Sequence, residues 1–176
     1  ASRWSPIHSF AEDVMTQDVI QEMEMSFSEG FADNDAGEFG AVAFAGYTLH
    51  NTSIGLRCFA FGIVFGVGGL FALAFNSVFL GAAFGHMTTS PHSEHFFEFV
   101  TAHGPFELTA IVLSAAAGMR LGFSLVATRG LRRSDSLALA ARKSLPVMMA
   151  AVTLFVLAAV IEGFISPSAL PYEVKA

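Results

Sequence analysis

An uncharged stretch of the chain, residues 58–85, most constrains how this protein can fold. It contains no acidic, basic or histidine side chain, and Asn76 and Ser77 are its only polar residues. A transmembrane helix needs about 20 consecutive apolar residues, and a helix in a soluble core rarely has so many. Only 14% of the 176 residues are charged, against about 25% in average soluble domains. The sequence therefore predicts an all-helical integral membrane protein with a single membrane domain.

Polar residues divide this stretch into unequal parts. We expect a first membrane helix over residues 54–75, after which Asn76 and Ser77 interrupt the apolar run. Residues 78–87 would then rise only about 15 Å as a helix, half the thickness of a bilayer. The sequence thus predicts a tight turn or kink at these two residues and a short returning arm, with one very long helix as the alternative.

Three further segments complete the membrane domain. Residues 88–103 combine a proline break with several phenylalanines, which suits a helix at the membrane interface. The next span is expected over residues 105–128, because Pro105 is tolerated at the first helical position. Residues 134–143 are typical of a short amphipathic helix, and residues 145–165 give a last span of about 31 Å. The fold class is a polytopic helical membrane protein with about three full spans plus a short returning or half-span helix.

Charge is distributed unevenly along the chain. Residues 1–50 hold nine of the fifteen acidic residues, whereas five basic residues and one acid lie within residues 129–143. The positive-inside rule places that basic loop on the cytoplasmic side of the membrane, which we expect to be a bacterial inner membrane. An acidic segment over residues 1–46 and a tail over 169–176 then lie outside the cell, flanking a multi-pass domain over 47–168. Such a short basic cluster indicates topology or contact with anionic lipid, so no nucleic-acid partner is expected.

Two ionisable residues lie inside one apolar run. Glu107 and Arg120 enclose twelve uncharged residues, and His103 precedes Glu107 by one helical turn. Thirteen residues of helix separate Glu107 from Arg120 by about 20 Å, too far for a direct pair. Antiparallel neighbouring helices would bring Glu162 close to His103 and Glu107. We expect Arg120 to find its partner in another helix, in backbone carbonyls, or in Asn76.

These intramembrane polar residues have two interpretations. Polar groups between membrane helices often form hydrogen bonds that fix the register of the helices. Ionisable groups at membrane depth also mark pathways for protons or substrates. We favour the structural network and keep the pathway as the alternative.

The histidines suggest a separate metal site near the predicted outer face. His92, His95 and Glu98 are spaced three residues apart and would partly share a helix face, where imidazole and carboxylate suit zinc or iron. Pro91 and neighbouring Ser and Thr residues instead predict an irregular, solvated loop. No HExxH, GxSxG or Walker motif is present. We keep these three residues as the metal-site alternative, and expect no cofactor and no enzymatic activity.

Glycines recur at helical spacing along the predicted spans. Small residues three or four positions apart let helix backbones approach closely. Packing within this one chain is favoured over homodimerisation, because the motif is common in any tight membrane helix. The predicted packing glycines are Gly62, Gly66, Gly69, Gly81, Gly85, Gly118 and Gly122.

Several motifs resemble the integral membrane stage II sporulation protein M family. They are HGPFELTAIVLSAAAGMRLG at residues 103–122 and, after the basic loop, AAVIEGFISP at residues 158–167. Residues 48–62 and 75–85 are similar to the earlier helices of that family. The resemblance extends over about residues 15–168. It implies a multi-helix membrane protein of the kind found in many bacteria and archaea, whose sporulation members join a complex with peptidoglycan hydrolases.

The resemblance also adds residues to the site. It includes Asn51 in the predicted polar network, although His50 replaces the first residue of a usual asparagine pair. Family members usually have a further helix upstream. An outward-facing N-terminal segment needs such an anchor, so we expect a membrane helix before residue 1. Among the positions that match family motifs are Gly104, Leu108, Gly163 and Pro167.

We therefore predict a non-enzymatic membrane scaffold or assembly subunit. Its partners would be membrane lipids and other integral membrane proteins, contacted through helix faces. One alternative is an accessory structural subunit of a large respiratory or photosynthetic complex. Another is a small channel or transporter whose path is lined by Glu107, Arg120 and Glu162.

Overall fold

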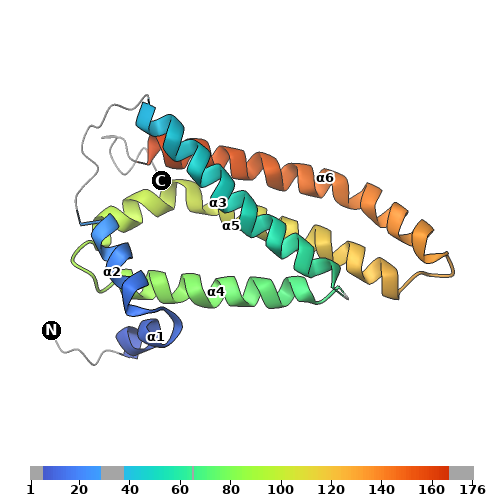
Figure 1. Ribbon diagram of the computed structural model, residues 1–176, viewed down its shortest axis with the longest axis horizontal. Coiled ribbons are helices and arrows are strands. Elements are labelled where there is room, and N and C mark those ends of the chain that lie inside the picture. The colour runs from blue at the N-terminus through green and yellow to red at the C-terminus, as the bar shows by residue number, and fades with distance from the viewer. Residues whose placement is uncertain (1–5, 29–37, 65, 167–176) are drawn as a thin grey trace.

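Helices make up all the regular structure in the described part of the chain. The computed structural model describes residues 6–28, 38–64 and 66–166. Figure 1 shows a bundle of long helices with two short helices at one side. The elements are α1 Pro6–Val14, α2 Gln17–Ser26, α3 Glu38–Ile63, α4 Gly68–Met87, α5 Ser93–Val126, α6 Arg133–Val160 and the π-helical turn η1 Ile161–Ile165.

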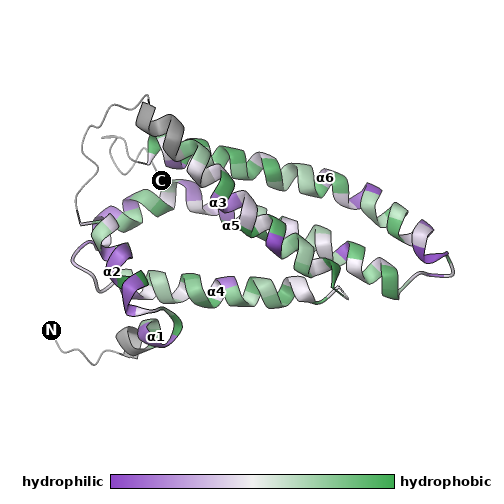
Figure 2. Ribbon diagram, viewed as in Figure 1, coloured by the Kyte–Doolittle hydropathy of each residue, from purple (hydrophilic) through white to green (hydrophobic). Residues whose placement is uncertain are grey.

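Three of these helices are long and apolar enough to cross a membrane. They are α4, α5, and α6 continued by η1 to Ile165. The prediction of an all-helical membrane protein with about three spans is thereby confirmed. Helix α3 is continuous over 26 residues, but polar residues interrupt its apolar sequence at His50, Asn51 and Arg57. Figure 2 accordingly shows hydrophilic positions along α3, whereas α4 is almost uniformly hydrophobic.

Helix α5 is the centre of the bundle. It packs most extensively against α6 and α3, and α4 makes smaller interfaces with α3, α5 and α1. In Figure 1, α4 lies along one edge of the bundle, with α1 beneath it. The fully buried ring of Phe155 from α6 fills the middle of the core, where Gly55 of α3 leaves room for it.

The turn between the first two long helices lies at Gly66, so the prediction of a break at Asn76 and Ser77 was wrong. Gly66 has φ +77°, a backbone conformation that glycine adopts without steric cost. Asn76 instead continues α4 because its amide Nδ2 donates a 2.8 Å hydrogen bond to the carbonyl of Ala72, one turn earlier. Its polar group is thus satisfied within the helix, and the returning arm is the full 20-residue helix α4.

Two expected helix boundaries are also absent from the described structure. Helix α5 runs without interruption through Pro105, and α6 runs through Pro146. Prolines are tolerated inside membrane helices where neighbouring helices hold the chain. Figure 1 shows α5 changing direction after its yellow-green first part, as a proline kink predicts. The interfacial and amphipathic segments are therefore extensions of the spans.

Helices α3 and α5 approach each other at glycines. A Cβ atom on Gly118 would collide with the backbone carbonyl of Phe59. A Cβ on Gly62 would lie 2.6 Å from the backbone nitrogen of Met119. Gly122 likewise faces the backbone of the α3–α4 turn. No side chain can be accommodated at these positions without separating the two helices.

The remaining glycines differ in their surroundings. A Cβ on Gly66 would meet the ring of Phe123, and one on Gly69 would meet the side chain of Met119. Gly81, in contrast, has no heavy atom within 4 Å of such a Cβ. Gly85 is partly exposed on the same helix. Most predicted packing glycines thus lie inside the bundle, whereas Gly81 leaves an open strip of backbone on α4.

Candidate functional site

Polar side chains from three helical elements converge at one end of the bundle. Asn51 comes from α3, His103 and Glu107 from α5, and Glu162 and Ser166 from the end of the last span. We call His103, Glu107 and Glu162 the carboxylate cluster. It lies at the η1 end of the bundle. The loop before α6, residues 129–132, and the start of α6 form the opposite, basic end, about 44 Å away along the helix axis.

The members of the cluster are close enough to interact directly. One ligand atom from each of its three residues lies within 4.8 Å of the others. Asn51 Nδ2 donates a 3.1 Å hydrogen bond to Glu162 Oε2. His103 Nε2 lies 3.8 Å from Glu162 Oε1, and its other ring nitrogen, Nδ1, lies 3.4 Å from Ser166 Oγ. Glu162 is therefore contacted from both α3 and α5.

The backbone around Glu162 is unusual. The amide of Ser166 donates a 2.7 Å hydrogen bond to the carbonyl of Ile161, five residues earlier, which is the π-helical pattern. Single π-helical turns inside α-helices often occur at functional sites. The wider turn places both Glu162 and Ser166 against α5. Gly163, which follows Glu162, is itself buried.

Most of the cluster is enclosed by the protein. Asn51, His103 and Glu162 are 2%, 4% and 7% exposed, respectively, whereas Glu107 is partly exposed. Among the described residues, no lysine or arginine forms an ion pair with Glu107 or Glu162. Two neighbouring carboxylates in a water-poor site cannot both remain charged without compensation. The site therefore requires a proton or a cation to balance them.

Arg120 lies far from this cluster. Its side chain is exposed near the basic end, where Nη1 donates a 2.8 Å hydrogen bond to the backbone carbonyl of Lys143. Backbone carbonyls were one of the three partners that the sequence left open. The structure does not bring Arg120 together with Glu107 or Glu162.

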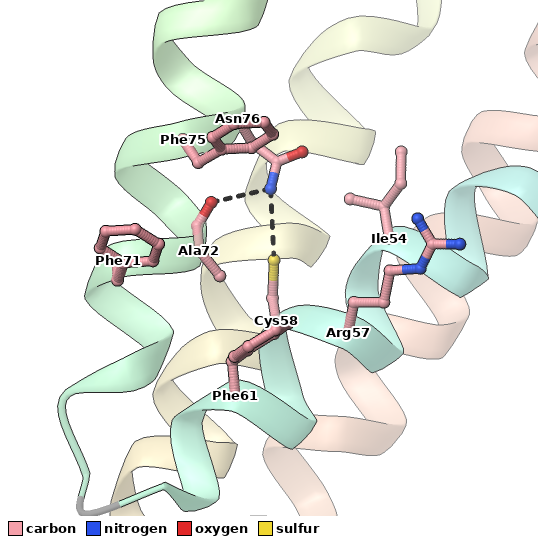
Figure 3. Close-up of a pocket in the computed structure, with 8 residues that line it drawn as sticks. All are labelled: Ile54, Arg57, Cys58, Phe61, Phe71, Ala72, Phe75 and Asn76. Carbon is pink, nitrogen blue, oxygen red and sulfur yellow. Dashed lines mark hydrogen bonds between the residues drawn. The ribbon is translucent and has the colours of Figure 1, made fainter.

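Asn76 belongs to a third region, a groove between α3 and α4. Figure 3 shows its amide pointing from α4 toward Cys58 on α3, with Nδ2 3.8 Å from Sγ. The groove has a volume of about 350 Å³. Its lining residues are mostly apolar: Ile54, Arg57, Cys58, Phe61, Phe71, Ala72, Phe75 and Asn76.

The predicted outer histidines do not form a site together. His95 Nδ1 lies 3.1 Å from the backbone carbonyl of Phe27, and His92 and Glu98 are partly exposed on α5 or just before it. Within the described residues, the carboxylate cluster is the one group of three or more His, Cys, Asp and Glu side chains arranged closely enough to share an ion. A metal site formed by His92, His95 and Glu98 thus remains a prediction, and the structure does not bring these three side chains together.

Sequence reasoning missed several polar residues. Ser166 stands one helical turn after Glu162, a spacing that could have identified it. Ser144 donates a 3.2 Å hydrogen bond from α6 to the carbonyl of Ala117, and nothing in its local sequence indicates this contact. Arg57 is the only lysine or arginine within α3 and lines the groove. Pro167 lies outside the described residues.

The family comparison covers nearly all of this architecture. The family model described as stage II sporulation protein M matches residues 7–167. That match includes all the described long helices and every residue of the carboxylate cluster. No curated protein and no solved structure is significantly similar to the chain.

Proposed function

The chain belongs to the stage II sporulation protein M family, and we propose that it is a non-enzymatic membrane scaffold that binds other integral membrane proteins. One observation carries this proposal. The polar residues at the η1 end join three elements of the same chain, whereas α4 leaves one face uncovered by the chain. The apolar window of α4 is 22% buried, against 28% for the span of α6 and η1 and 39% for α5. The polar residues at the η1 end thus stabilise the fold, and the exposed face of α4 is available to a partner.

The uncovered face of α4 suits a transmembrane helix of another protein. Exposed apolar side chains alone are not informative, because lipid covers them at no cost. Gly81, however, presents open backbone that lets a second helix approach closely. Phe71 and Phe75 of the same helix, which are 74% and 67% exposed, line the α3–α4 groove. The groove also offers the side chain of Asn76 as a hydrogen-bonding group.

The separation of the ionisable residues supports a scaffold over a channel. A transport path would join Glu107, Arg120 and Glu162. In this chain Arg120 is bonded to a carbonyl near the basic end, and the two acids lie in the distant carboxylate cluster. A second groove lies between α5 and α6 and is lined in part by Arg120. Neither this groove nor the α3–α4 groove is lined by Glu107 or Glu162.

Substitution of the open glycine tests the proposal. In native membranes extracted with mild detergent, we expect the wild-type chain to migrate in an assembly larger than itself. Gly81→Leu should return it to the size of the free chain without lowering its thermal unfolding midpoint. The matched control is Gly46→Leu, because a Cβ added to Gly46 on α3 would also meet no atom within 4 Å. An assembly unchanged by Gly81→Leu would contradict the proposal.

A flux assay separates the alternative function. Purified protein in liposomes should pass no more ions than empty liposomes do. Ion or solute flux that disappears in a Glu107→Gln variant, with folding and assembly intact, would identify a channel or transporter instead.

A further inference from the structure

We propose that the carboxylate cluster binds one divalent transition-metal ion, with His103, Glu107 and Glu162 as its protein ligands. The inference goes beyond the scaffold function and does not rest on it. The ion would join α5 to η1 inside the bundle. Asn51 and Ser166 would then orient the ligands without touching the ion.

The spacing of the donor atoms fits a small ion. Nitrogen and carboxylate ligands bind zinc at about 2.0–2.2 Å in a tetrahedral arrangement, so two ligands of one ion are about 3.4 Å apart. The three donor atoms of the cluster lie within 4.8 Å of one another. Small rotations of the two glutamate side chains would bring all three onto one ion.

The orientation of His103 is that of a metal ligand. Its Nδ1 lies 3.4 Å from Ser166 Oγ, and the imidazole packs edge-on against the ring of Phe99, with the ring centroids 5.2 Å apart. These contacts hold the ring in place and leave Nε2 facing Glu162 at 3.8 Å. Metal-binding histidines typically use one nitrogen for the ion and the other for such an orienting hydrogen bond.

Glu162 has a comparable second contact. Asn51 Nδ2 donates to its Oε2, which leaves Oε1 as the oxygen directed toward His103. Ligating carboxylates are commonly held by hydrogen bonds of this kind. Both Asn51 and His103 are more than nine-tenths buried, so water does not compete freely for these positions.

A divalent cation also resolves the charge balance of the site. Two carboxylates carry up to two negative charges, and no lysine or arginine of the described residues is paired with them. The exposed Arg120 is bonded to a carbonyl near the opposite end. An ion of charge +2 would neutralise both carboxylates at once, whereas a neutral cluster without metal would need two protons.

The donor types select among metals. One imidazole with two carboxylates suits Zn²⁺, Fe²⁺ or Mn²⁺, whereas Ca²⁺ and Mg²⁺ prefer sites made of oxygen alone. No thiolate takes part, because Cys58 lies in the α3–α4 groove beside Asn76. We choose Zn²⁺ as the probe.

The first experiment uses the full chain, purified in detergent through a histidine-free affinity tag. After treatment with a chelator and its removal, titration with Zn²⁺ should show one site per chain and raise the thermal unfolding midpoint. X-ray absorption of the zinc-loaded protein should report one imidazole with oxygen ligands. Absence of a stoichiometric site, or an ion bound by sulfur or by imidazoles alone, would overturn the proposal.

Variants then assign the site. Glu107→Gln should weaken Zn²⁺ binding at least 10-fold, and His103→Asn should do the same. The matched controls are Glu98→Gln and His92→Asn on the earlier part of the chain, which should leave the affinity unchanged. Equal affinity in Glu107→Gln and wild type, or loss of binding in the controls instead, would contradict the assignment. Should Glu107→Gln fail to fold, the absorption spectrum of the wild type still decides the outcome.

Discussion

The two ends of the bundle are held together in different ways. At the η1 end, the side chains of Asn51 on α3 and His103 on α5 both contact Glu162. Toward the basic end, Gly62, Gly118 and Gly122 bring the backbones of α3 and α5 into contact with no side chain between them. Side-chain hydrogen bonds select one register of the helices. Glycine contacts make the interface tight.

The contrast also explains where ionisable residues can lie. Glu162 at the η1 end is buried because neighbouring helices supply the amide of Asn51 and the imidazole of His103. Arginines toward the basic end are exposed, since a long side chain can carry its charge to the membrane surface. Ionisable residues in apolar helices are thus tolerated for different reasons at the two ends: neighbouring side chains bond to them at one end, and exposure solvates them at the other.

The largest expected effect comes from filling the glycine contact. Gly118→Leu would force α3 and α5 apart against the carbonyl of Phe59, and overpacking of this kind costs about 3 kcal/mol. A chemical-denaturation series in detergent measures the loss of unfolding free energy. Gly46→Leu is the control and should change it little. A Gly118→Leu protein as stable as the control would show that the glycine contacts between α3 and α5 do not stabilise the bundle.

Removal of a hydrogen-bond donor at the η1 end should have the next largest effect. Asn51→Leu leaves the buried Glu162 without its amide donor, which costs about 2 kcal/mol. Asn76→Leu is the matched control, because the amide of Asn76 bonds chiefly to its own helix. The same denaturation measurement should show a smaller loss for the control. Equal losses of unfolding free energy would show that a hydrogen bond between helices stabilises the protein no more than one within a helix.

Anionic lipid should stabilise the basic end alone. The groove between α5 and α6 is lined by Arg120, Arg129 and Lys143, and each basic residue near a membrane surface is worth about 1 kcal/mol of attraction to anionic lipid. The double variant Arg129→Gln with Lys143→Gln should reduce the rise in unfolding midpoint caused by added phosphatidylglycerol. The midpoint in neutral detergent should not change. A variant that responds to the lipid as the wild type does would contradict this expectation.

The smallest effect is expected at Arg120 itself. Arg120→Gln removes one exposed hydrogen bond to the carbonyl of Lys143, worth less than about 1 kcal/mol. The unfolding midpoint in neutral detergent provides the measurement, with Arg57→Gln as an exposed control on α3. A loss as large as that of Asn51→Leu would mean that Arg120 stabilises the core of the bundle and is not merely an exposed residue of the basic end.

Much of this organisation could be predicted from spacing. The number of spans follows from the apolar segments, and helical rise separates Arg120 from Glu107. The grouping of His103, Glu107 and Glu162 follows from antiparallel neighbouring helices, and the structure places the three together. The role of this group stays a prediction, because proximity alone does not assign it.

Other features depend on contacts that spacing does not reveal. The break at Gly66 was missed because Asn76 is the more polar residue, although its amide is satisfied by its own helix. Prolines such as Pro105 and Pro146 are typical of helix starts, yet packing between helices holds both inside continuous spans. The position of Ser166 depends on a π-helical turn, and no local sequence rule predicts that turn.

That π-helical turn makes the site sensitive to chain length. One residue more or less rotates everything that follows by about 100° relative to an uninterrupted α-helix. Insertion of one residue between Ile161 and Ser166 would therefore turn Ser166 away from His103. Loss of one residue there would instead convert the five-residue hydrogen bond of Ser166 into the four-residue bond of an α-helix, which keeps Ser166 near its present position. The membrane span would remain long and apolar in both cases. In this part of the chain, the number of residues determines which side chains meet.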